Sequence, residues 1–200
     1  ASVRTVPVVL DLVGGTGARF RTELTIGNRG SSSATARLEL SAAPGFGGGQ
    51  SRPEGGSVSV EIAGRTELRI ADAIAYLRNK GLPVPAAPVA GSLTVLGDAG
   101  GLVGSATNDL YAIARTYTGD ASGGTYGLFY DAPSDVDAAE DEGAVFGLRS
   151  VADASRSHLG LVHLPHRGEL PVELSIQVYS DAGVASGAPI TRTLQPGEWG

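Results

Sequence analysis

The sequence predicts an all-β fold, arranged as two tandem antiparallel immunoglobulin-like β-sandwiches with one short helix in the first. Polar and apolar residues alternate in several segments, as in Phe20 to Gly27, where every second side chain falls on the same face. The 200 residues include 30 glycines and 11 prolines, which suits many short strands joined by turns. One strand segment, 21–28, recurs at 156–163 with the same order of residue types.

The first half has the pattern of a complete sandwich. The strands are expected at 5–13, 20–27, 34–40, 57–62, 67–70, 91–96 and 105–118. The glycine-rich stretch 44–56 reads as a long loop, and the three prolines of 82–90 indicate an extended segment. A helix is expected at 71–79, because Ile70, Ile74 and Leu77 share one side and Gly81 follows as a stop signal.

The glycine-rich stretch 119–125 has the composition of a linker. It divides the chain into a first domain, 1–118, and a second domain, 126–200. Strands of the second domain are expected at 126–130, 144–149, 156–163, 170–179 and 189–194.

The repeat extends beyond its central strand. Residues 9–13 match 145–149, residues 34–40 match 172–178, and residues 62–65 match 194–198 with one residue inserted. In the first half a strand and the helix follow this last turn. The second half is therefore expected to lack at least one strand, leaving an exposed edge that a truncated sequence or a strand from another chain would explain.

The segment from Phe20 to Gly30 reads aromatic-Arg-Thr-Glu-Leu-Thr-Ile-Gly-Asn-Arg-Gly, and it precedes alternating strands and a tight turn. This pattern resembles the tandem β-sandwich repeat segments of large secreted and surface proteins of bacteria. The resemblance implies a secreted, non-enzymatic repeat unit with an extracellular or cell-surface location. It brings no catalytic residues with it.

Composition disfavours several classes of partner. The formal net charge is −6, and Lys80 is the one lysine in the sequence. A nucleic-acid partner is not expected because phosphate contacts need a basic face, and docking on anionic membranes is disfavoured for the same reason. No apolar run approaches the roughly 18 residues of a spanning helix, so no membrane insertion is expected. Cysteine is absent, which excludes disulfides and thiolate metal sites. The sequence begins with Ala1, as after processing or trimming.

The glycines that follow Val9 to Val13 look like a cofactor motif. Gly14-Gly15-Thr16-Gly17 is similar to the first motif of S-adenosylmethionine methyltransferases and to half of a dinucleotide fingerprint. Both chemistries need a helix directly after the glycines, whose N-terminus binds the cofactor. An alternating strand follows instead, so we expect a hairpin turn and no cofactor.

Two further patterns suggest catalysis or metal binding. The loop around Asp120 and Ser122 is similar to a serine-protease nucleophile loop, but no histidine precedes it and no nucleophile elbow is present. His158, His163 and His166 are closely spaced, although Pro165 interrupts any helix that would put them on one face. We expect a flexible linker at the first site, surface histidines at the second, and no enzyme activity.

The acidic loop that begins at Asp131 is the most plausible ligand site. Clustered carboxylates suit Ca²⁺, which prefers six to eight oxygen ligands, although the spacing is not that of an EF-hand. A solvated acidic loop is the alternative. The candidate metal ligands are Asp131, Asp135, Asp137, Glu140 and Asp141.

The expected function is that of a non-catalytic structural or adhesive module, in which strand donation joins subunits of a filament. Ser2 to Leu10 is the natural donor segment. The alternative is a carbohydrate- or calcium-binding module that is accessory to a secreted enzyme. Aromatic side chains can form a sugar platform or fill the core, and the candidates are Tyr111, Tyr117, Tyr126, Phe129, Tyr130 and Trp199.

Overall fold

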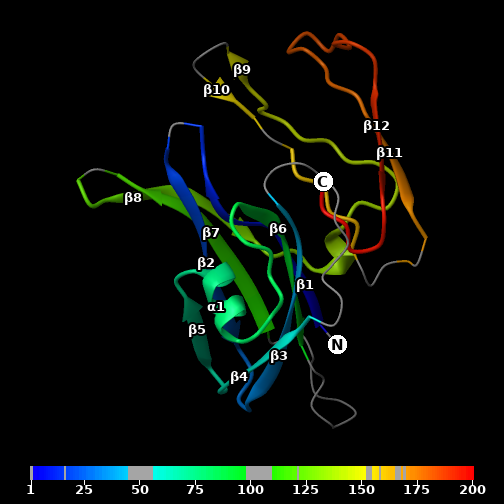
Figure 1. Ribbon diagram of the computed structural model, residues 1–200. Coiled ribbons are helices and arrows are strands. Elements are labelled where there is room, and N and C mark those ends of the chain that lie inside the picture. The colour runs from blue at the N-terminus through cyan, green and yellow to red at the C-terminus, as the bar shows by residue number, and fades with distance from the viewer. Residues whose placement is uncertain are drawn as a thin grey trace.

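The computed structural model describes residues 2–15, 17–44, 56–97, 110–120, 122–151, 155–157, 159–164, 168 and 170–200. These residues form an all-β, sandwich-like fold with a single α-helix, α1 (Ala73–Asn79), and antiparallel strand pairs (Figure 1). The strands are β1 (Ser2–Val13), β2 (Arg19–Asn28), β3 (Ala34–Pro44), β4 (Val58–Ile62), β5 (Thr66–Ile70), β6 (Val89–Gly97), β7 (Leu110–Gly119), β8 (Thr125–Asp131), β9 (Ser150–Val151), β10 (Ser155–Arg156), β11 (Val172–Ile176) and β12 (Ile190–Leu194). A 3₁₀ turn, η1 (Asp135–Asp137), follows β8.

The large sheet divides at β2 into two layers. Its strand order is β4-β3-β6-β1-β2-β7-β8, and β5 also pairs with β2. Strand β1 pairs with β2 only through residues 11–13, and β5 takes its place beside residues 24–28. The main core contains buried residues from both layers, among them Leu38, Leu93, Leu24 and Ile26. The burial of β4 alternates strictly, as expected for a strand with one face in this core.

Helix α1 lies against β1 and β2 and buries Ile74 and Leu77 in the main core. It begins at Ala73, slightly later than the expected start at 71, because the Asp72 carboxylate caps it by accepting a hydrogen bond from the backbone N–H of Ala75 at 2.9 Å. It ends at Asn79, and Gly81 follows the C-cap Lys80 with a φ of +88°, a conformation that glycine adopts readily.

Asp11 ties three elements of the first half together. Its buried carboxylate accepts hydrogen bonds from Arg19 at 2.9 Å and from Arg78 of α1 at 2.8 Å. Burial alone would raise the pKa of Asp11, but the two guanidinium groups outweigh it and hold this pKa below its usual value. The ion pairs therefore connect β1, β2 and α1.

The glycines of the candidate cofactor motif form the β1–β2 turn. The Gly14 N–H donates to the Ala18 carbonyl at 2.8 Å, and the Gly17 N–H donates to the Gly14 carbonyl at 2.9 Å. No helix begins here, so the cofactor chemistry lacks the helix N-terminus it needs. The predicted hairpin turn is confirmed, while Thr16 lies outside the described residues.

Residues 119, 120 and 122–124, from the stretch whose composition is typical of a linker, form the turn of the β7–β8 hairpin, and Ala121 lies outside the described residues. The Asp120 carboxylate accepts hydrogen bonds from the N–H and hydroxyl of Ser122 and from the N–H of Gly124. The hydroxyl contact, followed by these backbone contacts, lowers the pKa of Asp120. Strand β8 thus continues the large sheet, with Thr125 opposite Gly119. The division into two domains stays a prediction.

The second half forms less strand than predicted. Residues 144–149 were expected to be a strand, but they have no strand partner, and Phe146 is 89% exposed. Of the segment 156–163, Arg156 belongs to β10 and Val162 makes an isolated bridge. Amphipathic alternation marks a segment that can form a strand, but the strand also needs a neighbour for its backbone groups.

Candidate functional site

The hairpin of β11 and β12 repeats the pairing of β3 and β4. In the first hairpin Ala34 pairs with Ile62, and the register runs to the pair of residues 38 and 58. In the second, Val172 pairs with Leu194, and the register runs to the pair of residues 176 and 190. The sequence repeat places Val172 at the position of Ala34 and Leu194 at that of Ile62. The predicted repeat is therefore confirmed in the strand pairing of these segments.

The contacts before and after each hairpin also correspond. The Asn28 side chain donates to the Ile62 carbonyl at 3.0 Å, and the His163 ring nitrogen Nδ1 lies 3.3 Å from the Leu194 carbonyl. Asn28 pairs with Thr66, four positions after Ile62, and His163 bonds through its N–H to the carbonyl of Glu198, four positions after Leu194. The turn therefore has the same length in both copies, and the residue inserted in the sequence alignment was an error.

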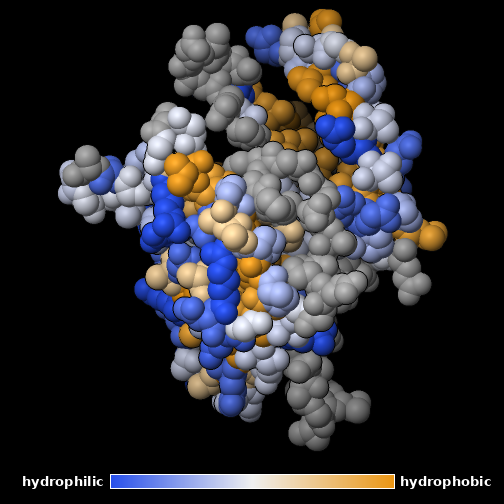
Figure 2. Space-filling model, viewed as in Figure 1, coloured by the Kyte–Doolittle hydropathy of each residue, from blue (hydrophilic) through white to orange (hydrophobic). Residues whose placement is uncertain are grey.

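The second copy leaves uncovered an apolar face that is buried in the first. Strand β3 has β4 on one edge and β6 on the other, whereas β11 pairs with β12 alone among the described residues. Leu40 is 1% exposed, but Val178 at the corresponding position is 43% exposed. Val58 is 6% exposed, but Ile190 is 48% exposed. Figure 2 shows apolar residues gathered at the upper right, where Figure 1 places β11 and β12.

Trp199 attaches the second copy to the first. Its indole N–H donates to the Pro7 carbonyl at 3.1 Å, and its ring packs in a small second core with Leu10, Leu12 and Ala90. The pairing of β1 with β6 is irregular between Val6 and Val9, where Pro7 has no N–H to donate to a ladder. The irregularity leaves the Pro7 carbonyl for the indole. Ser41 also donates a hydrogen bond to the Gly197 carbonyl.

The acidic candidates are spread along the chain after β8. Asp131 ends β8 opposite Ile113, Asp135 and Asp137 lie in η1, and Glu140 and Asp141 follow in the loop. The Asp137 carboxylate accepts hydrogen bonds from the Ser134 hydroxyl at 2.6 Å and from its N–H, contacts that lower the pKa of Asp137. In the part of the chain that the structure describes, no three acidic or histidine side chains form a group that could hold a metal ion. Calcium binding stays a prediction.

The histidines and aromatics take separate places. His163 is partly buried in the second copy, while His158 and His166 lie outside the described residues. Tyr126 and Phe129 are exposed on β8, at 58% and 66%, whereas Trp199 is 4% exposed. Aromatic side chains are thus divided between surface and core.

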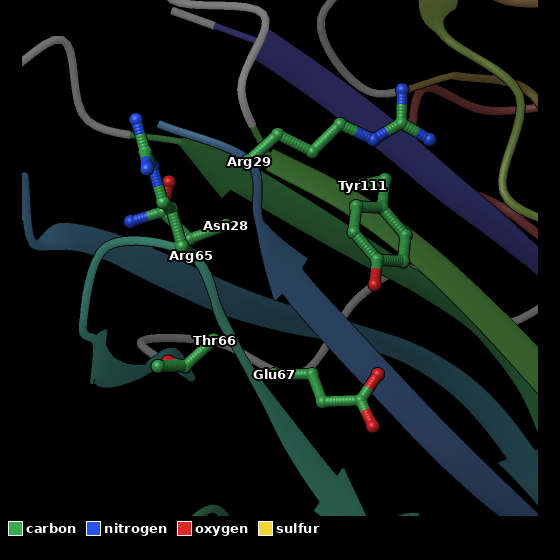
Figure 3. Close-up of a pocket in the computed structure, with 6 residues that line it drawn as sticks. All are labelled: Asn28, Arg29, Arg65, Thr66, Glu67 and Tyr111. Atoms are coloured by element: carbon green, nitrogen blue, oxygen red, sulfur yellow. The ribbon is translucent and has the colours of Figure 1, made fainter. Parts of the chain in front are cut away.

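Sequence reasoning missed a surface pocket of about 400 Å³ at the end of β2, opposite the turn that joins β4 to β5 (Figure 3). Tyr111, Arg29 and Arg65 give it its chemistry. No sequence signal marked it, because Arg65 matches Gly197 only in the structural register of the two copies and not in the sequence alignment with its inserted residue. The residues lining the pocket are Asn28, Arg29, Arg65, Thr66, Glu67 and Tyr111.

None of the helical residues that the structure describes forms a helix long and apolar enough to cross a membrane. No protein family, curated protein or solved structure matches this chain.

Proposed function

We propose that the chain is a non-catalytic structural module of a secreted or cell-surface protein, and that an added β-strand completes its second copy at the free edge of β11. The supporting observation is the shared register of the two hairpins. The edge of β3 that corresponds to this free edge is occupied by β6 over nine residue pairs. Adding a strand would satisfy the backbone groups at this edge of β11 and place cross-strand neighbours beside its apolar side chains.

The first copy specifies what the added strand should look like. Strand β6 places Val95 opposite Leu38 and Leu93 opposite Leu40. The positions corresponding to Leu38 and Leu40 are Ile176 and Val178. The partner is therefore an extended, uncharged segment with aliphatic residues at alternate positions, running antiparallel to β11. When filled in this way, the second copy would have a three-stranded sheet, one layer of the immunoglobulin-like sandwich expected from its sequence.

The segment Ser2 to Leu10, expected as the strand donor, already has a place in its own chain. It pairs with β6 on both sides of the irregularity between Val6 and Val9, and both valines are completely buried. Donating it to another subunit would break up the first core. We therefore assign the donor role to a segment with the pattern of β6. The extracellular location rests on the resemblance of the segment from Phe20 to Gly30 to bacterial surface repeats.

The proposal is tested with a synthetic peptide of residues 89–97, carrying two added lysines at each end for solubility. A saturable interaction is expected, with slower amide hydrogen exchange in β11 and no change in β7. The control peptide has aspartate in place of Leu93 and Val95, and it should not slow amide hydrogen exchange in β11. Equal protection by both peptides, or none by either, contradicts strand addition.

A further inference from the structure

The pocket at the end of β2 has a pre-arranged aromatic floor. Tyr111 pairs with Gly27 across β2 and β7. A Cβ atom at Gly27 would lie 2.1 Å from the Tyr111 ring, so the ring can occupy this place only because residue 27 is glycine. The guanidinium carbon of Arg29 lies over the ring, 4.8 Å from its centre. This cation–π pair joins an exposed arginine to the aromatic floor of the pocket.

Hydrogen bonds hold together the two loops that carry the arginines. The Asn28 side chain donates to the carbonyls of Ser32 and Ile62, at 2.8 and 3.0 Å, and accepts from the N–H of Gly30 at 2.9 Å. The Arg65 N–H donates to the Gly30 carbonyl at 2.8 Å. Arg29 and Arg65 therefore project from two loops that cannot move apart without breaking these bonds.

Arg65 occupies a backbone conformation that favours glycine. Its φ is +58°, and it is the one non-glycine residue with a positive φ in the described part of the chain. Gly197, at the same turn position of the second copy, has a φ of +79°. An arginine here strains the turn, and glycine would not. A glycine at position 65 would remove this backbone strain. We therefore infer that the Arg65 side chain has a function that offsets the strain.

The charges at this pocket suit an anion. Glu67 forms an ion pair with Arg69, with 2.7 Å between Oε1 and Nε, so part of its charge is already balanced. Across the described residues, neither Arg29 nor Arg65 forms an ion pair. Two arginines without acidic partners are therefore gathered at one place on a protein of net charge −6.

We propose that this pocket binds the carboxylate of a uronate sugar. One guanidinium group can match a carboxylate in a two-point contact, and Arg29 and Arg65 each carry such a group at a different side of the pocket (Figure 3). The Tyr111 hydroxyl points towards the side of the pocket where Glu67 lies (Figure 3). These two side chains provide hydrogen-bonding partners for sugar hydroxyls, and the volume of about 400 Å³ is in the range of small-ligand pockets. The pocket is lined by residues of the first half, so binding there does not require strand addition at β11.

The most informative variant is Arg65→Gly, which removes the side chain and the backbone strain together. We expect it to raise the melting temperature by a few degrees while weakening binding at least tenfold. Arg29→Gln should weaken binding similarly. Arg149→Gln removes the same charge from an exposed residue outside the pocket, and it should bind like the original protein.

Binding is measured by calorimetry and by amide chemical shifts, with galacturonate and its trimer as ligands. Neutral galactose and inorganic phosphate are the comparison ligands. The proposal expects a saturable interaction with the uronates, weaker binding of phosphate, and none of galactose. It is overturned if Arg65→Gly binds uronate normally, if galactose binds equally well, or if inorganic phosphate binds as tightly as the uronates. The last result would identify a simple oxyanion site.

Discussion

The indole N–H of Trp199 donates to the carbonyl of Pro7 across 3.1 Å, joining positions near opposite ends of the sequence. Pro7 lies where the β1–β6 ladder is irregular, so its carbonyl is not required for strand pairing. The contact connects the repeated hairpin to the first half, whose main core contains no residue of that hairpin.

Trp199→Phe should weaken this attachment by about 1 kcal/mol, because it removes one hydrogen bond and keeps most of the packing. Trp199→Ala should weaken it by about 3 kcal/mol, since it also empties the second core. Limited proteolysis provides the measurement. Cleavage in the segment that follows residue 160 should be faster in Trp199→Phe than in the original protein, and fastest in Trp199→Ala. The amides of β3 and β6 should remain protected from hydrogen exchange in both variants. If they lost protection together with the second copy, the second copy would not be attached as a separate unit.

Asp11→Asn should reduce the free energy of unfolding by about 2 kcal/mol at neutral pH. Breaking a buried pair usually costs more, but Arg19 is half exposed to solvent. The folded pKa of Asp11 lies below its unfolded value, so the ion pairs stabilise fully above the unfolded pKa, about 3.9. This stability is lost as the pH falls through the folded pKa.

Denaturant unfolding at several pH values checks this prediction. The difference between the original protein and Asp11→Asn should be constant from pH 7 to about pH 5 and should shrink below about pH 4. Asp181→Asn, in an exposed turn, is the matched control and should change little throughout. If the difference in unfolding free energy between the two proteins grew in acid, the pKa of Asp11 would be raised on folding, contrary to this prediction.

Gly91→Ala should destabilise the first half by about 3 kcal/mol. Its Cβ atom would lie 2.0 Å from the Ser41 carbonyl oxygen and 2.8 Å from the Ala42 Cα, both of which are backbone atoms in a paired strand. Gly15→Ala is the control, because nothing lies within 4 Å of its Cβ position. Thermal melting should show a clear loss for the first substitution and a shift near zero for the second.

Corresponding substitutions in the two copies should have unequal costs. Val58→Ala opens a cavity in the main core and should cost about 2 kcal/mol. Ile190→Ala removes a larger side chain but should cost less than about 1 kcal/mol, because Ile190 is 48% exposed. Denaturant unfolding of both variants provides the comparison. Equal costs would mean that the second copy is as well covered in solution as the first.

The strands and the helix of the first half could be predicted because each apolar pattern there belongs to a segment that finds a partner in the sheet or the core. The alternation of Ser57 to Ile62 became β4, and the apolar spacing before Gly81 became α1. The second half was harder, since residues 144–149 have a strand pattern but no neighbouring strand to pair with. Sequence alternation indicates which face of a strand is apolar, and it does not say whether another strand will lie beside it.

The candidate site was largely beyond reach of the sequence. The acidic residues from Asp131 onward are close together in the sequence, and this closeness predicted a metal site. Closeness in the sequence does not bring side chains together around one ion. The pocket brings together Arg29, Arg65 and Tyr111 from three separate segments, and only the register of β2 with β5 and β7 places them together. The unusual backbone of Arg65 becomes visible only when its turn is compared with that of Gly197.

The two hairpins keep one register although one is enclosed on both sides and the other is largely open. Their pairing must therefore be encoded within each hairpin, by its own side-chain alternation and its own following turn. Such a hairpin can be transferred as one unit. Replacing residues 34–62 with residues 172–194 should leave the strand order of the recipient sheet unchanged. Chains of this type can therefore lengthen by duplication of the hairpin without changes in the segments that connect the copies.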